Sequence, residues 1–222
     1  MIDARTQRSI RVLVNGAASG VGLACAEAFA ASGAQLILCD LDASGLAIAG
    51  ERLHAYSRVC DSIADSSVTS FAADIAGTFP SVDVLINAAG RGYVRSLAMV
   101  RMTRAMLPLL RAPGGAARFV FNLSPLGGFA STDGIFPYAS SVEAFDRLHD
   151  SLIDLVRGTS VELTRVHPQM LRGQSGARVG DRQLYALQRI DGQATAQVLV
   201  RRVAVARPDW KASTPTTLNR RA

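Results

Sequence analysis

Lysine and cysteine are both scarce in this chain. Lys211, near the C-terminus, is its only lysine, so a site elsewhere in the sequence that needs a lysine amine has no nearby candidate. The three cysteines, Cys25, Cys39 and Cys60, are odd in number and show no CxxC spacing. They predict neither a disulfide framework nor a metal site, and they favour a reduced cytoplasmic compartment.

The sequence also lacks long apolar runs. No segment approaches the roughly 18 consecutive apolar residues that a membrane span needs. Residues 1–11 are polar and lead directly into a predicted strand, without the apolar region of a signal peptide. We therefore expect a cytoplasmic protein with no membrane partner.

Basic charge is not concentrated in one part of the chain. The formal net charge is +6, and clustered arginines would bind phosphate backbones through charge and counterion release. Apart from the pairs Arg201-Arg202 and Arg220-Arg221, however, the arginines are scattered, and no aromatic residues are interleaved with these pairs. Because bare charge is a weak signal, we expect no nucleic-acid partner.

What the sequence does contain is a regular alternation of strand and helix patterns. Apolar residues make up 49% of the chain, enough for a packed core without disulfides. The predicted strands are 11–14, 35–40, 57–61, 82–87, 118–123 and 161–166. The predicted helices are 21–31, 43–54, 66–79, 97–110, 138–156 and 195–206. Such alternation is typical of βαβ units that build a parallel sheet.

This pattern predicts an α/β fold. We expect a Rossmann-type, doubly wound parallel sheet in three layers, formed by a single domain over residues 1–222. Residues 11–168 are its expected core. Residues 169–190, which begin with the irregular segment 169–180, are an expected substrate-loop region, and residues 213–222 an expected flexible tail.

A glycine-rich segment joins the first predicted strand to the first predicted helix. Its sequence is Asn15-Gly16-Ala17-Ala18-Ser19-Gly20-Val21-Gly22. In this context glycines let the backbone approach a pyrophosphate, whose charge is stabilised by the free N–H groups of the helix N-terminus. Asp40 ends the second strand, where a carboxylate accepts hydrogen bonds from ribose hydroxyls and repels the extra phosphate of NADP. The combination predicts an NAD site, whereas the alternative is that these residues serve only chain reversal and helix capping.

These segments resemble the short-chain dehydrogenase/reductase family. The loop is similar to the TGxxxGxG motif of that family, with Asn15 in place of the Thr, and Asn87-Ala88-Ala89-Gly90 resembles its NNAG motif, with Ala88 departing from it. Asp61 matches the adenine-contacting Asp that follows the third strand. The resemblance covers residues 11–168 and implies NAD as cofactor. It assigns cofactor contacts to Asn15, Gly16, Ser19, Gly20, Val21, Gly22, Asp40, Asp61, Asn87 and Gly90.

The resemblance is weaker at the catalytic centre. In that family a Tyr exchanges a proton with the substrate, a Lys four positions later lowers the pKa of that Tyr, and a Ser orients the substrate oxygen. The resemblance places the Tyr at Tyr138, but Val142 stands at the Lys position and Pro125 at the Ser position. Ser124, one position earlier, remains the candidate for the Ser role, and Arg95 falls near the position of the family's assisting Asn. A phenol whose pKa stays near 10 is a poor acid–base group at neutral pH, so the family's usual mechanism is not fully represented.

Three functions remain open from the sequence alone. The first is an NAD-dependent oxidoreductase that acts on an alcohol or carbonyl, with Tyr138 aided by Ser124 or by another cation. The second is a non-catalytic protein that binds a dinucleotide or another ligand, which the residues Val142 and Pro125 favour. The third, a non-redox lyase or isomerase, has no motif in its support. His167, at the end of the last predicted strand, is an alternative acid–base residue, and the small-molecule substrate or ligand is not identified.

The resemblance also implies self-association. The predicted helices 97–110 and 138–156 are similar to those that pair across a two-fold interface in that family. The second of these helices carries apolar residues at helical spacing. We therefore expect a homodimer or homotetramer.

Overall fold

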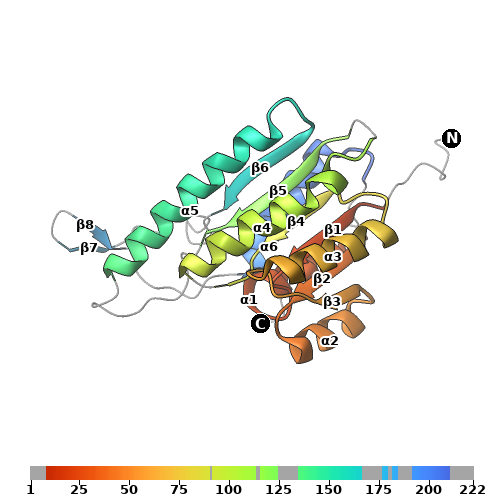
Figure 1. Ribbon diagram of the computed structural model, residues 1–222, viewed down its shortest axis with the longest axis horizontal. Coiled ribbons are helices and arrows are strands. Elements are labelled where there is room, and N and C mark those ends of the chain that lie inside the picture. The colour runs from red at the N-terminus through yellow and green to blue at the C-terminus, as the bar shows by residue number, and fades with distance from the viewer. Residues whose placement is uncertain are drawn as a thin grey trace, which may run out of the picture.

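A single parallel sheet forms the centre of the molecule. The structure is a computed structural model that describes residues 9–90, 92–113, 116–124, 135–166, 177–179, 182–184 and 192–210. The strands of the sheet are β1 (Arg11–Asn15), β2 (Gln35–Asp40), β3 (Tyr56–Val59), β4 (Val84–Asn87), β5 (Arg118–Leu123) and β6 (Val161–Val166). Their order is β3-β2-β1-β4-β5-β6, and every neighbouring pair is parallel (Figure 1). This order reverses direction between β1 and β4, which confirms the predicted doubly wound, Rossmann-type fold.

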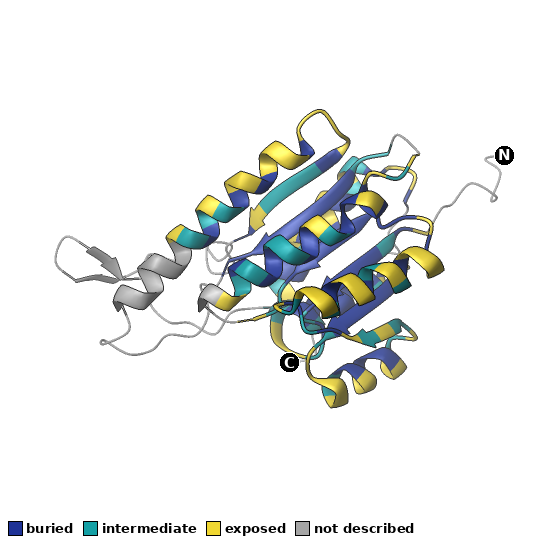
Figure 2. Ribbon diagram, viewed as in Figure 1, coloured by how far each residue is buried: buried dark blue, intermediate teal, exposed yellow. Residues whose placement is uncertain are grey.

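Helices cover both faces of the sheet and give it three layers. The helices are α1 (Gly20–Ala31), α2 (Ala43–Arg52), α3 (Asp65–Thr78), α4 (Gly92–Leu110), α5 (Ile135–Val156) and α6 (Gly192–Ala206). Successive side chains of a strand point to opposite faces. Val12 and Val14 of β1 accordingly pack in the cluster that contains α1, α2 and α6, whereas Leu13 packs in the cluster with α3, α4 and α5. The inner strands β1, β4 and β5 are therefore buried on both faces, whereas the edge strands β3 and β6 are only partly buried, as Figure 2 shows.

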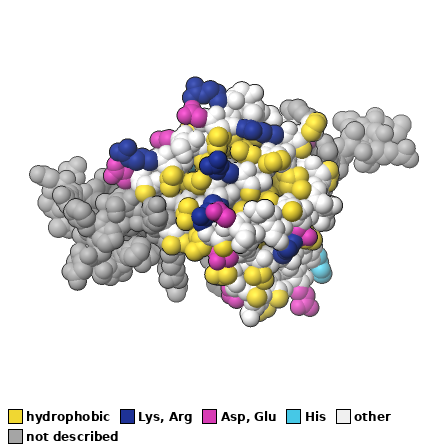
Figure 3. Space-filling model, viewed as in Figure 1, with side chains coloured by type: hydrophobic (Ala, Val, Ile, Leu, Met, Phe, Trp, Pro, Cys, Tyr) yellow, Lys and Arg dark blue, Asp and Glu magenta, His cyan; other side chains and the backbone are white. Residues whose placement is uncertain are grey.

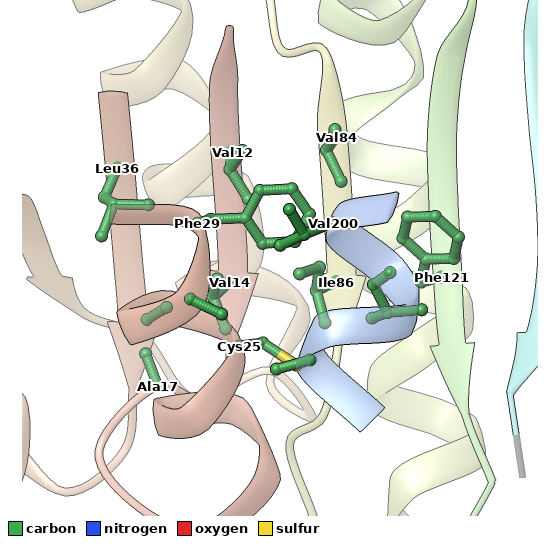
Figure 4. Packing of buried hydrophobic residues seen from close by; sticks show 14 of the residues in the cluster. Val12, Val14, Ala17, Cys25, Phe29, Leu36, Val84, Ile86, Phe121 and Val200 are labelled. Atoms are coloured by element: carbon green, nitrogen blue, oxygen red, sulfur yellow. The ribbon is translucent and has the colours of Figure 1, made fainter. Parts of the chain in front are cut away.

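The first of these clusters joins two helices that are far apart in the sequence, α1 and α6. Figure 4 shows Phe29 and Cys25 of α1 and Val200 of α6 packed together over Val12 and Ile86 of the sheet. Helices α1 and α6 are far apart in sequence, so the last helix completes a core that the first helix begins. The position of α6 next to α1 is consequently fixed by apolar packing rather than by chain connectivity.

Several element boundaries differ from the sequence prediction. Helix α4 begins at Gly92, a little more than one turn before the predicted start. The prediction missed this first turn because residues 92–96 contain no clear capping signal. Within the predicted irregular segment and beyond it, Ala177–Val179 and Arg182–Leu184 pair as the antiparallel strands β7 and β8. These strands are too short for a hydrophobic pattern to reveal them, although the Gly-Asp dipeptide between them is typical of tight hairpins. The remaining residues of 169–190 and all of 213–222 lie outside the described part of the chain.

A buried carboxylate holds together the amino ends of three strands. Asp83 precedes β4 and is 7% exposed. Its Oδ1 lies 3.2 Å from Nε of Arg118, at the start of β5, and 3.3 Å from Nη1 of Arg207, just after α6. Its Oδ2 accepts a hydrogen bond of 2.9 Å from the backbone N–H of Arg11 at the start of β1. One carboxylate thus contacts two buried guanidinium groups, of which that of Arg207 also pairs with Asp209 at 2.7 Å, and it fastens the end of α6 to the sheet.

Surface charge is dispersed on the face formed by α3, α4 and α5. Basic and acidic side chains lie near one another there, with apolar side chains between them (Figure 3). Examples are the exposed pair Arg147–Glu143 on α5 and the exposed pair Arg157–Asp154 at the C-terminal end of that helix. No helix among the described residues is long and apolar enough to cross a membrane.

The carboxylate of Asp83 provides a test of this fold. Asp83→Ala should lower the free energy of unfolding by about 3–5 kcal/mol, because it removes the counter-ion of the buried Arg118 and one of the two carboxylates that pair with the buried Arg207. Glu143→Ala is the matched control, since it removes the acid of an ion pair whose side chains are 79% and 64% exposed and should change stability much less. Urea denaturation of both variants measures the difference. Equal losses of stability in the two variants would show that Asp83 does not hold the sheet in this way.

Candidate functional site

The backbone after β1 packs very closely against the chain that follows β4. Gly16 has a φ of +93°, and a Cβ placed on it would lie 2.5 Å from the backbone nitrogen of Ala89. A Cβ on Gly22 would lie 1.9 Å from the carbonyl oxygen of Gly16. Neither position accepts a side chain without movement of backbone atoms. A Cβ on Gly20, by contrast, would meet no atom within 4 Å, so the loop is closed toward the sheet and open around Gly20.

The start of α1 is suited to an anion. Ser19 is the N-cap residue, its side chain makes no capping hydrogen bond, and the first turn of α1 contains no acidic residue. Backbone N–H groups at the first turn of a helix lack partners within the helix, and the helix dipole adds partial positive charge there. Gly20, Val21 and Gly22 supply the N–H groups of this turn. The arrangement can therefore bind a phosphate group.

Two acidic residues stand at the carboxyl edge of the sheet beside this loop. Oδ2 of Asp40 accepts a hydrogen bond of 2.9 Å from the backbone N–H of Ala18, so the carboxylate is fixed next to the loop. Its Oδ1 accepts from the N–H of Asp42 at 3.1 Å. Asp61, two residues after the end of β3, accepts from the N–H of Ile63 at 3.0 Å. These contacts orient both carboxylates at the ends of neighbouring strands.

Large apolar side chains lie exposed next to both carboxylates. Leu41 follows Asp40 and is 65% exposed, and Ile63 lies two residues after Asp61 and is 40% exposed. Exposed apolar side chains near fixed hydrogen-bond acceptors are features of a surface that binds a flat, partly polar ligand. This part of the edge can therefore hold an adenosine group.

Buried amide side chains connect the carboxyl ends of β1, β4 and β5. Nδ2 of Asn15 donates to Oδ1 of Asn87 at 3.4 Å, and Nδ2 of Asn87 donates to Oδ1 of Asn122 at 2.8 Å. Nδ2 of Asn122 lies 3.0 Å from Nδ1 of His149 on α5. These four side chains, which we call the amide chain, are all 2% exposed or less. Asn87 also donates to Oγ1 of Thr103 on α4, so the amide chain ties two helices to the sheet.

The sequence indicated some members of the amide chain and missed others. Asn15 and Asn87 were assigned to the cofactor site by their motifs, and both lie at strand ends there. His149 was not singled out, because it carries no metal-ligand spacing. Its signal was a polar residue within an apolar helical stripe that also includes Phe145 and Leu152, both of which are buried.

The end of β5 is tied to the end of β4 by a cation. Nε and Nη2 of Arg95 donate to the carbonyl oxygen of Gly90 at 3.0 and 2.8 Å, and Nη1 donates to the carbonyl oxygen of Ser124 at 3.3 Å. Ser124 is 1% exposed, and its Oγ has no hydrogen-bond partner among the described residues. A positive charge therefore lies between the two loops, next to a buried hydroxyl group.

The candidate tyrosine belongs to helix α5. Tyr138 lies in the first turns of that helix, which begins at Ile135, and Val142 lies one turn further on. The side chains of both residues are outside the described part of the structure, as are Pro125, His167 and Lys211. The structure thus places the backbone of Tyr138 in a regular helix, and the contacts of its side chain stay predictions.

Thiolate and metal chemistry find no support in the described residues. Burial raises the pKa of Cys25 to about 12, and burial is also the largest cause that raises the pKa of Cys39 and of Cys60. At neutral pH these groups are thiols rather than nucleophilic thiolates. No cluster of three or more His, Cys, Asp or Glu side chains that could hold a metal ion occurs in the part of the chain that the structure describes.

Comparison with known proteins gives consistent matches. The family model for short chain dehydrogenases matches residues 11–183. Dehydrogenase/reductase SDR family member 7B of Bos taurus is 30% identical over 190 residues, and the match spans 72% of this chain but only 58% of that relative.

Solved structures resemble the chain in fold. A short chain dehydrogenase/reductase from Burkholderia phymatum in complex with NAD has a TM-score of 0.70 at 22% identity, covering 91% of this chain and 88% of the other. A metagenomic short-chain oxidoreductase in complex with NADP has a TM-score of 0.69 at 20% identity, covering 89% and 91%. Neighbours in fold thus include both an NAD complex and an NADP complex.

Proposed function

The chain belongs to the short-chain dehydrogenase family, a family of oxidoreductases, and on that premise we propose that it binds NAD(H) and transfers hydride to or from a small molecule. The reacting group would be an alcohol or a carbonyl. The observation that carries the proposal is the loop after β1, which is closed against Ala89, open at Gly20 and bordered by the fixed carboxylate of Asp40. This geometry fits the pyrophosphate and ribose of a dinucleotide.

The preference for NAD rests on Asp40. Its carboxylate is held by the N–H groups of Ala18 and Asp42, so it cannot easily turn away from the loop. Asp40 would accept hydrogen bonds from the ribose hydroxyls, and it would repel a phosphate group at the same position. Asp61 would contact the adenine base, and Asn15, Ser19, Val21, Asn87 and Gly90 complete the proposed cofactor site.

Tyr138 is the proposed acid–base group. In alcohol oxidation its phenolate would take the hydroxyl proton as a hydride leaves the carbinol carbon, so that a carbonyl forms. Bound NAD supplies the acceptor for that hydride. Val142 adds no positive charge next to Tyr138, and Arg95, hydrogen-bonded to the loops after β4 and β5, is the cation that the described site offers instead. Ser124 is the proposed partner of the substrate oxygen.

A non-catalytic binding protein is the second candidate. The observation that favours it is the burial of Ser124. This residue is 1% exposed, and its hydroxyl oxygen has no hydrogen-bond partner among the described residues. Together with Val142 and Pro125, this would leave the dinucleotide site intact while the usual catalytic residues are missing. Under this alternative the protein binds NAD(H) without turnover.

We also propose that the protein forms a homodimer or homotetramer. Helices α4 and α5 pack side by side on one face of the sheet (Figure 1). Large apolar side chains are exposed on these helices at Val94, Ile153 and Leu155. Pairing of this surface with a second copy would remove those side chains from water.

The first prediction concerns the cofactor. Isothermal titration calorimetry should show that NADH binds at least about tenfold more tightly than NADPH, because Asp40 opposes the extra phosphate. Asp40→Ala should reduce this preference, since it removes the ribose acceptor and the repulsion together. Asp42→Ala, which removes a nearby carboxylate that caps α2, is the matched control and should retain the preference. Absence of binding of either cofactor at millimolar concentration would rule the proposal out.

The second prediction concerns acid–base catalysis. The rate of alcohol oxidation should be low at pH 7 and rise toward alkaline pH, because a phenol without a neighbouring lysine ionises near pH 10. Val142→Lys should raise the rate at neutral pH or move the profile to lower pH. Tyr138→Phe should remove the activity while NADH binding stays unchanged.

The outcomes of the second experiment separate the candidate functions. No turnover in the wild type together with NADH binding would support the non-catalytic alternative. Brisk turnover at neutral pH that survives Tyr138→Phe would contradict both candidates and would direct attention to His167.

The third prediction concerns assembly. Light scattering at micromolar protein concentration should report a mass of at least two chains. Ile153→Glu, placed on the exposed face of α5, should shift the protein toward the monomer, because it puts a charge into an apolar contact. Val205→Glu on α6, where the side chain is 78% exposed, is the control and should leave the mass unchanged. A wild-type monomer would refute the proposal.

A further inference from the structure

The hydrogen bonds of the amide chain all run in one direction. The thiol of Cys39 donates to Oδ1 of Asn15 at 3.6 Å, and Nδ2 of Asn15 donates to Oδ1 of Asn87. Asn87 donates in the same sense to Asn122, and Nδ2 of Asn122 faces Nδ1 of His149 at 3.0 Å. Because an amide NH₂ group can only donate, Nδ1 of His149 is the acceptor at the end of the series.

This polarity gives His149 a particular role. If the acceptor at Nδ1 were lost, the NH₂ group of Asn122 would be buried without a partner, or the amide would have to turn over. A turned amide would place its NH₂ group against the NH₂ group of Asn87, and the mismatch would pass on toward Asn15. The hydrogen bonds of a buried network also strengthen one another, because each bond polarises the next. The acceptor on His149 therefore fixes the orientation of the amides back to the glycine loop.

The two ends of the amide chain lie at functionally different places. Asn15 is the last residue of β1 and immediately precedes Gly16 of the proposed dinucleotide loop. His149 lies on α5, eleven positions after Tyr138, which is about three turns of a helix. Phe145, about one turn before His149, is fully buried and lies with its ring near the ring of His149, with centroids 6.4 Å apart.

We propose that His149 is a positioning residue that, through Asn122 and Asn87, holds the dinucleotide loop and the tyrosine-bearing helix α5 in a fixed relation. This inference rests on the proposed function for its consequence, because the fixed relation serves to align a bound cofactor with Tyr138. The coupling itself is a property of the free protein. Loss of the acceptor should therefore loosen the loop around Gly16 even though His149 lies on a different element.

Three variants separate this role from a general contribution to stability. His149→Phe keeps an aromatic ring against Phe145 but removes the acceptor. His149→Asn is the rescue variant, because its Oδ1 reaches the region of the original Nδ1. Phe145→Leu is the matched control, since it weakens packing on the same face of α5 without touching a hydrogen bond of the amide chain.

The first measurement is hydrogen–deuterium exchange of the full chain without cofactor. His149→Phe should speed exchange in the peptide around residues 12–23 by about threefold or more, a usual size for coupling through a packed network. His149→Asn should exchange nearly as the wild type. Phe145→Leu should speed exchange in that peptide only as much as its lower overall stability, measured as a lower melting temperature, would produce. The proposal would be overturned if His149→Phe exchanged at the rate of the wild type. It would also be overturned if His149→Phe and Phe145→Leu had the same melting temperature and the same exchange rate in that peptide.

The second measurement is the affinity for NADH. His149→Phe should weaken binding about threefold or more, and His149→Asn should restore it. If the wild type binds no NADH, the proposed function fails, while the exchange experiment still decides whether the coupling exists. If NADH binds but the loop exchanges identically in all variants, the coupling fails and the proposed function stands.

Discussion

Burial of three asparagine amides is the constraint on which the arrangement of the carboxyl edge depends. Asn15 is level with Asn87 in the strand register, and Asn87 is level with Asn122. A buried amide without partners is costly, so each of these side chains requires its neighbour at this distance. Their hydrogen bonds can form only when β1, β4 and β5 are adjacent and end at the same level. The loops that follow these strands are thereby brought to one place, where a ligand can contact all of them.

The loops themselves are positioned by backbone contacts rather than by side-chain bulk. Gly16 and Gly22 allow the chain after β1 to touch the chain after β4, and Gly192 at the start of α6 lies against Ala24 and Val21 of α1. Arg95 then joins Gly90 to Ser124. A site assembled in this way tolerates changes in side chains that face the ligand better than changes in the glycines. The loss of a catalytic lysine or serine would thus leave the fold and the conformation of the dinucleotide loop unchanged.

The sequence predicted the parts of the structure that local patterns determine. Buried strands such as Gln35–Asp40 stand out because their apolar runs are continuous, and Asp40 is identified by its place at the end of one. The ion pair of Asp83 with Arg207 and the hydrogen bond from Asn122 to His149 could not be predicted, because their partners are separated by 124 and 27 positions and no pattern connects them. The start of α4 was missed for a different reason, since helix starts without capping residues leave no mark in the sequence.

The pairing of Asp83 with Arg207 also sets an order of events during synthesis of the protein. The two residues are separated by 124 positions, so the carboxylate leaves the ribosome well before its partner. At about 5–20 residues per second, that interval lasts roughly 6–25 seconds. Until then the apolar face that α6 covers, including Phe121 and Ile86, remains open to water. The growing chain therefore completes this core only after α6 and Arg207 have been made, and a ribosome that stalls before Arg207 would hold a nascent chain that chaperones can bind.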